Sequence, residues 1–218
     1  MYRTEHPEPQ FYRESYECLN GIWEFAFGSG EGRTDCALDG TINVPFSPES
    51  ALSGVGERGL FTECVYSRLL HLTERDLESR LAVHFGAVDY EAEVYLNGVR
   101  LCRHEGGYTP FVAELNPAAR AGENRLTVVV RDDVRDNVPS GKQSAREDSF
   151  GCFYTRTTGI WQTVWLERTP HEYVRSVRFF PDAEHARVGA EICTQGEGEL
   201  SVIVRYQGRT VGSVSTQI

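Results

Sequence analysis

Residues 131–150 form the longest stretch of the chain without a repeating hydrophobic pattern, and they concentrate side chains that could do chemistry. A loop of roughly twenty residues in a globular domain is usually functional or mobile. Carboxylate, amide and ammonium groups suit a ligand rich in hydroxyl groups, because each hydroxyl both donates and accepts a hydrogen bond. A solvated polar loop without a specific role would have the same composition. The candidate ligand-binding residues are Asp132, Asp133, Asp136, Lys142 and Gln143.

Adjacent carboxylates on this loop could also suggest hydrolytic chemistry. Cleavage of a glycosidic bond with retention needs two carboxyl groups about 5.5 Å apart. The pairs available are Asp132 with Asp133 and Glu147 with Asp148. Adjacent residues point in different directions, and neither pair has an evident environment that would raise one pKa. We therefore expect no catalytic residue in this chain.

The histidines and cysteines form no pattern typical of catalysis or metal binding. No Ser-His-Asp arrangement is discernible, and for His104 we expect a hydrogen bond that orders its loop rather than acid–base work. The six cysteines are widely spaced and include no CxxC pair. We expect them to be reduced and to act as small apolar side chains. The sequence predicts neither a metal nor a cofactor.

Composition excludes several classes of protein. With 218 residues, 40% of them apolar and 11% aromatic, the chain can bury a substantial core. A net charge of −10 argues against binding to nucleic acid or to an anionic membrane. No stretch approaches the roughly 18 apolar residues of a membrane span, and the N-terminus lacks the apolar segment of a secretory signal. We therefore expect a cytoplasmic protein.

The candidate loop needs a scaffold, and residues 80–111 indicate what that scaffold is. Leu81, Val83 and Phe85 recur at every second position, the period-2 apolar alternation of a half-buried strand. The alternation resumes over residues 91–96 and ends at Asn97-Gly98, the dipeptide best suited to a tight hairpin. The return strand begins at Val99, and residues 104–111 are expected to form a loop. This succession is typical of an antiparallel sandwich.

Other segments repeat the strand signal. Residues 126–130 are almost continuously apolar, as in a strand covered on both faces. Thr73 and Asp76 predict a short helical turn with a capping box over residues 73–79. We expect Arg68 to be paired inside the fold, since buried arginines are nearly always paired. Further strands are expected at residues 19–27, 42–46, 64–72 and 160–166.

Four blocks of sequence, in order, carry a family resemblance: LNGIWEFAF (19–27), INVPFSPESALSGVG (42–56), AVDYEAEVYLNG with HEGGYTPF (87–111) and FYTRTTGIWQTVWLE (153–167). Together they resemble the N-terminal sugar-binding domain of glycoside hydrolase family 2, the family of β-galactosidases, β-glucuronidases and β-mannosidases. The resemblance implies an all-β, galactose-binding-like jelly-roll sandwich over residues 1–168. In the family this domain precedes an immunoglobulin-like domain and a TIM barrel that carries both catalytic glutamates.

The resemblance also implies a role for the candidate loop. In the family, the corresponding loop reaches toward the mouth of the barrel, where an acidic residue binds sugar hydroxyls. Asp133 and Asp136 are the best matches to that position, and Lys142 and Gln143 are their neighbours.

Residues 169–218 predict four short strands, at 173–180, 186–193, 199–206 and 209–215. Their spacing suits an immunoglobulin-like sandwich, but such a domain needs about 100 residues and seven strands. We therefore expect the first part of such a domain, truncated, with an exposed apolar face and unpaired edges.

The expected function is that of a non-catalytic, sugar-binding N-terminal portion of a larger glycosidase, with β-galactosidase as the first expectation for the parent. Its partners would be a terminal β-linked sugar and the C-terminal barrel; nucleic acid and membrane are not expected, and a homo-oligomer is left open. Two alternatives remain: a free-standing carbohydrate-binding module, which should end near Glu167, and a purely structural interaction domain.

Overall fold

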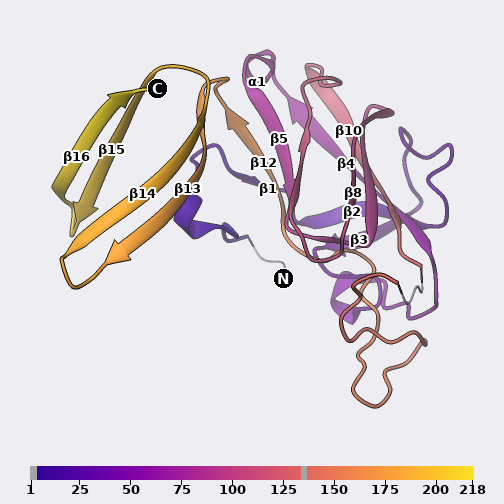
Figure 1. Cartoon of the computed structure of the whole chain (residues 1–218). Coiled ribbons are helices and arrows are strands. Elements are labelled where there is room, and N and C mark those ends of the chain that lie inside the picture. Colours follow the sequence, from indigo (N-terminus) through magenta and orange to yellow (C-terminus); the bar gives the residue numbers. More distant parts are fainter. Residues whose placement is uncertain (1–3, 134–136) are drawn as a thin grey trace. The chain divides into compact units, whose positions relative to one another are not determined.

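The structure is a computed structural model that describes residues 4–133 and 137–218. The chain divides into two units, Met1–Arg168 and Thr169–Ile218. Figure 1 shows both as β-structures built from antiparallel strands. The predicted all-β fold class is confirmed.

The first unit is a sandwich of two antiparallel sheets. The four-stranded sheet has the order β1 (Glu17–Cys18), β12 (Val164–Thr169), β5 (Arg80–Phe85) and β9 (Phe111–Glu114). The six-stranded sheet has the order β3 (Gly40–Val44), β2 (Gly21–Phe27), β4 (Glu63–Leu72), β10 (Gly122–Arg131), β7 (Glu91–Leu96) and β8 (Val99–Glu105). A separate short ladder pairs β6 (Val88–Asp89) with β11 (Gly159–Ile160).

In residues 4–133 and 137–218, helical structure is confined to three short turns, η1 (Pro9–Phe11), η2 (Ala51–Ser53) and α1 (Glu74–Leu77). Within the described part of the chain, no helix has the length and apolar character needed to cross a membrane. The capping box predicted for α1 is present: Thr73 Oγ1 accepts from the Asp76 N–H, and the Asp76 carboxylate accepts from the Thr73 N–H.

One hydrophobic cluster fills the space between the two sheets. Alternate residues of β7 point inward as predicted, and Ala92, Val94 and Leu96 are fully buried. They meet the inward side chains of β5, whose Leu81, Val83 and Phe85 share the same cluster. Arg68 lies at the rim of this core, where its Nη1 donates to the Leu19 carbonyl at 2.7 Å, in keeping with its predicted structural role.

Strand β10 is the central strand of the larger sheet and is covered on both faces. It pairs with β4 along its whole length and with β7 from Leu126 to Arg131. Leu126 and Val130 point into the core, while Val129 on the opposite face lies under the loop at Gly30. This covering loop explains the continuous apolar run that the sequence shows over residues 126–130.

Elsewhere the outer face of the six-stranded sheet carries cross-strand ion pairs. Arg125 Nη1 lies 2.6 Å from Glu24 Oε2, and Arg131 Nε lies 2.9 Å from Glu63 Oε1. Arg103 bonds Glu91 in the same way at 2.9 Å. Each exposed pair contributes only about 0–1 kcal/mol, but opposite charges across neighbouring strands favour this register over a shifted one.

Two boundaries differ from the sequence-based expectation. His104 and Glu105 belong to β8, so the loop after it begins at Gly106; ladder pairing with β7 extends the strand to Glu105. The segment 160–166 is not one strand, because Trp161 follows β11 and β12 starts only at Val164. The Asn97-Gly98 turn is as predicted, with φ angles of 52° and 79°.

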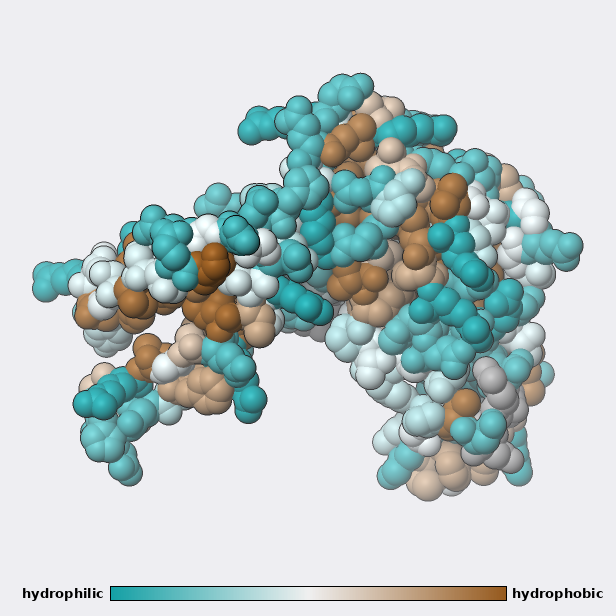
Figure 2. Space-filling model, turned by 45° about the horizontal axis from the view of Figure 1, so that its top comes forward, coloured by the Kyte–Doolittle hydropathy of each residue, from teal (hydrophilic) through white to brown (hydrophobic). Residues whose placement is uncertain are grey.

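The second unit consists of two antiparallel hairpins, β13 (Tyr173–Asp182) with β14 (Arg187–Gln195) and β15 (Glu199–Tyr206) with β16 (Arg209–Gln217). Their facing sides enclose a cavity of about 410 Å³ lined by apolar side chains such as Ile192 and Val202. Hydrophobic side chains gather around this hollow in Figure 2. The apolar face expected from the sequence is therefore present, while the assignment to an immunoglobulin-like domain remains a prediction.

We predict that Leu126→Ala lowers the free energy of unfolding of the first unit by about 2–5 kcal/mol, because it leaves a cavity in the shared core. All three tryptophans lie in this unit, so urea unfolding followed by tryptophan fluorescence reports on it alone. Leu69→Ala on the neighbouring strand is the matched control, since Leu69 is 43% exposed, and should change stability by less than about 0.5 kcal/mol. Equal effects of the two variants would contradict the assigned core.

Candidate functional site

The long connection from β10 to β11, residues 132–158, projects from one end of the first unit's sandwich (Figure 1). It lies beside the segment around η2 and beside the loop 106–110 between β8 and β9, with which it lines shared cavities. A segment this long without regular structure needs side chains to fix its course, because its backbone has few ladder partners.

A buried ion pair joins the two ends of this loop. Arg156 Nη2 donates to the backbone carbonyl of Asp132 at 2.6 Å and to its Oδ2 at 2.8 Å. Thr158 Oγ1 donates to the same Oδ2 at 2.9 Å, and the Thr158 N–H donates to Glu49 Oε2 at 3.2 Å. Separating the two partners would leave a buried charge without compensation, which is energetically costly. The ion pair therefore holds the two ends of the loop together.

Gln143 attaches the middle of the loop to the sandwich. Its Nε2 donates to Asp89 Oδ2 at 2.6 Å and to Tyr108 Oη at 3.3 Å. Its Oε1 accepts from the Thr157 N–H at 2.8 Å. One amide side chain thus links β6, the loop after β8 and the far end of its own loop.

Asp89 can sit so deeply because the backbone opposite carries no side chain. A Cβ on Gly107 would lie 2.3 Å from Asp89 Oδ1, so only glycine fits there. The carbonyl of Gly107 in turn accepts from Trp161 Nε1 at 2.8 Å. Gly107 therefore allows the 106–110 loop to pack closely against the buried Asp89 carboxyl.

The loop also pairs with itself. The Ser144 N–H donates to the Tyr154 carbonyl, and the Tyr154 N–H donates to the Lys142 carbonyl, both at 2.7 Å. Farther out, the rings of Phe150 and Phe153 stack with centroids 5.1 Å apart. The Arg146 guanidinium covers the Phe150 ring at 4.1 Å. These contacts give the projecting segment a small apolar centre of its own.

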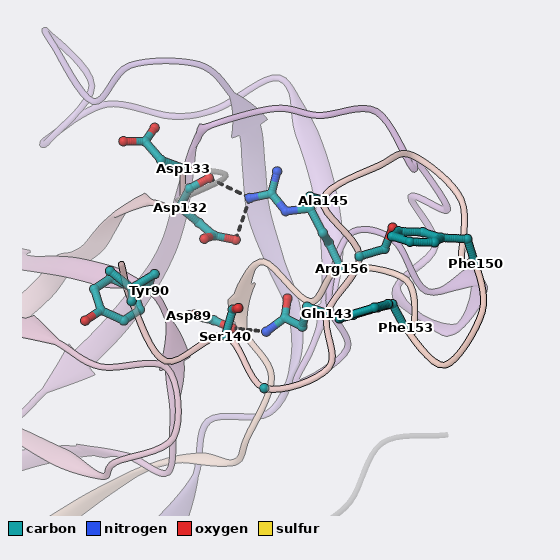
Figure 3. A pocket seen from close by; sticks show the side chains of 13 residues that line it. Asp89, Tyr90, Asp132, Asp133, Ser140, Gln143, Ala145, Phe150, Phe153 and Arg156 are labelled. Carbon is teal, nitrogen blue, oxygen red and sulfur yellow. Dashed lines mark hydrogen bonds and ion pairs between the residues drawn. The ribbon is translucent and has the colours of Figure 1, made fainter. Parts of the chain in front are cut away.

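Gln143 and Asp89 line two cavities. The first, the loop cavity, has a volume of about 280 Å³ and is shown in Figure 3. Asp133, close to the end of β10, lines it, and its carboxylate points away from the Arg156 guanidinium. Its other polar lining residues are Asp89, Asp132, Ser140, Gln143, Ser144 and Arg156, and its aromatic ones are Tyr90, Phe150 and Phe153.

The second cavity, the aromatic cleft, has a volume of about 260 Å³. It shares Asp89 and Gln143 with the loop cavity. Its remaining lining residues are Tyr108, Lys142, Tyr154, Thr155, Thr157 and Trp161.

Burial shifts the protonation of two carboxyls near the cavities. Desolvation raises the pKa of Asp89 to about 6; the hydrogen bond from Gln143 opposes this shift, and the nearby Asp132 charge adds to it. Burial likewise raises the pKa of Glu49, against the hydrogen bonds it accepts from Thr158. The buried Arg156 guanidinium thus lies among three carboxyl groups, those of Asp89, Asp132 and Glu49.

The structure brings together three of the five predicted site residues. Asp132, Asp133 and Gln143 line the loop cavity, whereas Lys142 lines the aromatic cleft. Asp132 is buried in the ion pair with Arg156, so its Oδ2 serves the closure of the loop. Asp136 lies outside the described residues.

Sequence reasoning missed several residues of this region. Asp89 is not among the predicted site residues, although a lone carboxylate between the apolar residues of AVDY is a signal of a buried polar group. Trp161 falls inside the expected strand 160–166, and Arg156 lies just before it in the same block of family resemblance. Their pairing with residues more than twenty positions away leaves no local trace in the sequence.

The residues described contain no group of three or more His, Cys, Asp or Glu side chains that could hold a metal ion. Chemically, the two cavities offer hydrogen-bonding groups, aromatic faces and one ammonium group. Asp89 and Asp132 are each held by a hydrogen-bond or ion-pair partner. The arrangement suits binding of a polar, hydroxyl-bearing ligand.

Comparisons with known proteins point to one family. The family model described as "Glycosyl hydrolases family 2, sugar binding domain" matches residues 56–170, more than half of the chain. The chain is 28% identical over 207 residues to a β-glucuronidase of Paenibacillus borealis, covering 84% of this chain and 35% of that protein. It is also 28% identical over 156 residues to a β-galactosidase of Thermoanaerobacterium thermosulfurigenes, covering 68% of this chain and 22% of that protein.

A solved structure gives the same result for the fold. The β-glucuronidase of an uncultured Clostridium sp. superposes with a TM-score of 0.72 at 25% identity, covering 100% of this chain and 41% of that one. The chain therefore spans about a third of the length of the curated β-glucuronidase it matches.

We predict that Asp89→Asn removes a pH-dependent destabilisation of the first unit. In the unfolded chain an aspartate titrates near pH 3.9, whereas the pKa of folded Asp89 is about 6. The folded state therefore holds an extra proton between about pH 4 and 6, and this group lowers the free energy of unfolding as pH rises through that window. The variant should gain stability relative to wild type, reaching on the order of 2–3 kcal/mol at pH 7.

The measurement is urea unfolding at several pH values, expressed as the difference between variant and wild type. The difference is needed because burial lowers the pKa of His84 to about 4, which gives the opposite slope in the same window. Asp39→Asn, at an exposed position, should show a difference independent of pH. A flat difference for Asp89→Asn as well would refute the shifted pKa.

Proposed function

Because the chain belongs to glycosyl hydrolase family 2, as its sugar-binding domain, we propose that it forms one wall of the active site of an exo-acting β-glycosidase. In this proposal the catalytic carboxylates come from another part of a longer polypeptide. The chain supplies a rigid scaffold and the loop 132–158, which contacts the sugar at the outermost position of the substrate.

The loop cavity is the observation that carries this proposal. Asp133 lines this cavity and is exposed, and the neighbouring Asp132 holds the base of the loop through its ion pair with Arg156. A carboxylate on a loop fixed at both ends can accept hydrogen bonds from two sugar hydroxyls. Binding then loses little conformational entropy, because the loop is already ordered. The rigid attachment of the loop therefore supports a binding role for Asp133 rather than a solvated one.

The carboxyls of this chain are proposed to bind and position rather than to cleave. A retaining mechanism needs one carboxylate available as nucleophile and a second carboxyl group as proton donor, about 5–5.5 Å apart. Asp132 is committed to Arg156 and Thr158, and Asp89 to Gln143. Neither presents an unoccupied carboxylate to a substrate.

For the substrate we infer a terminal β-glucuronide or β-galactoside. Relatives of both names resemble the chain, and the β-glucuronidase covers more of it, 84% against 68%. This coverage favours β-glucuronides over the β-galactosides expected from the sequence alone. The sugar specificity itself would depend on groups outside this chain.

We predict that Asp133→Asn, made in the full-length protein, lowers kcat/KM by about 10- to 100-fold on nitrophenyl β-glycosides. The loss of a charge-assisted hydrogen bond to a sugar hydroxyl costs on the order of 1.5–3 kcal/mol. The panel should contain the glucuronide, galactoside and mannoside, and wild-type enzyme should cleave one of the first two fastest.

The control is Asp39→Asn, an exposed aspartate far along the chain from the loop, which should leave kcat/KM unchanged. An unchanged kcat/KM for Asp133→Asn would remove this residue from the proposed sugar contact. A full-length protein inactive on every β-glycoside of the panel would overturn the proposed function itself.

A further inference from the structure

The aromatic cleft is a second concave site that the proposed sugar contact at Asp133 does not use. Three aromatic side chains, Tyr108, Tyr154 and Trp161, line it together with polar groups. Tyr108 is 49% exposed and Tyr154 is 67% exposed, so neither ring is packed inside the fold. Clustered exposed rings beside convergent polar groups are typical of a binding site.

Two of the three rings are fixed by their polar ends. Tyr108 Oη donates to the Ser140 carbonyl at 2.9 Å, and Trp161 Nε1 donates to the Gly107 carbonyl at 2.8 Å. The two rings meet edge to face with centroids 5.8 Å apart. A ligand that packs on them therefore loses little side-chain entropy, because the rings are already ordered.

Tyr154 is positioned by its backbone rather than by its side chain. Its N–H and carbonyl bond to the Lys142 carbonyl and the Ser144 N–H at 2.7 Å. This pairing places Lys142 and Tyr154 on adjacent segments that line the same cleft. The ring itself is solvent-exposed, so its removal should not disturb the loop.

The polar groups of the cleft match a ring with several hydroxyls. Gln143 and Asp89 line it, and the hydroxyls of Thr155 and Thr157 add donors and acceptors. Among residues 4–133 and 137–218, no carboxylate forms an ion pair with the Lys142 ammonium, which can therefore donate to a ligand. The volume of about 260 Å³ is below the roughly 300–1,000 Å³ of sites for drug-sized ligands and suits a single ring.

We propose that the aromatic cleft binds one pyranose ring of a carbohydrate, as a second sugar site distinct from the proposed contact at Asp133. The apolar C–H face of the ring packs on Tyr154 and Trp161, and its hydroxyls bond to Lys142 and the threonines. The ligand class rests on the proposed function; the site itself rests on the geometry of the cleft.

The test is titration of the 218-residue chain with D-galactose, D-glucose and D-glucuronate, followed by NMR of the three tryptophan indole N–H signals. Trp23 and Trp165 are 1% and 3% exposed, so a sugar in the cleft should shift the Trp161 signal alone. We expect saturable binding of at least one sugar, with Tyr154→Ala raising its Kd at least about tenfold. Tyr206→Ala, a 68% exposed tyrosine of the second unit, is the matched control and should leave Kd unchanged.

Three results would overturn the cleft site: no saturation by any of the three sugars up to about 100 mM, shifts spread equally over all three indoles, or an unchanged Kd in Tyr154→Ala. The Asp133→Asn variant distinguishes failure of the cleft site from failure of the proposed function. If Asp133→Asn abolishes the binding while Tyr154→Ala does not, the sugar occupies the loop cavity, and only the cleft site is lost. If neither variant changes the Kd but the full-length protein cleaves β-glycosides, the cleft site again fails alone.

Discussion

The buried ion pair between Asp132 and Arg156 is the interaction on which the candidate site depends. It joins the first residue after β10 to a residue shortly before β11, and so closes a long irregular segment at its base. Without this closure, ordering the loop would cost conformational entropy that its few backbone pairings could hardly offset. The pair is buried and shares Oδ2 with Thr158, so its geometry is fixed from several directions. A mobile loop would have to become ordered each time a ligand bound. Here the ion pair orders the base of the loop before any ligand binds.

Gln143 extends this rigidity from the base of the loop to its middle. A single amide satisfies a buried carboxylate, a tyrosine hydroxyl and a backbone N–H at once. Its cost is the burial of Asp89, whose pKa rises as a consequence. An apolar pair of similar shape would be easier to bury than Asp89 and Gln143. Their hydrogen bond is therefore better explained by its effect on the loop, which it holds in one arrangement. Gln143 and Asp89 line both cavities, so their hydrogen bond fixes part of the wall of each.

The second unit poses a different physical problem. Its two hairpins bury few side chains, and Phe179, Ile203 and Val214 are each more than half exposed. Two-stranded hairpins are marginally stable in water without a further layer.

The sequence by itself determined the elements whose signal is local. The alternation of β5 and β7, the Asn97-Gly98 turn, the α1 capping box and the four strands after residue 169 all depend on neighbours a few positions apart. It also located the polar loop, because the absence of periodicity is itself a local property. Only the tertiary structure decided which polar residues of that loop face a cavity and which close it: Asp132 and Asp133 are adjacent in sequence, yet one is buried against Arg156 and the other lines the site. Likewise Asp89, Tyr108 and Trp161 meet Gln143 and Lys142 only in the fold, since the contacts that bring them together span tens of residues and follow from the stacking of strands, which no short pattern encodes.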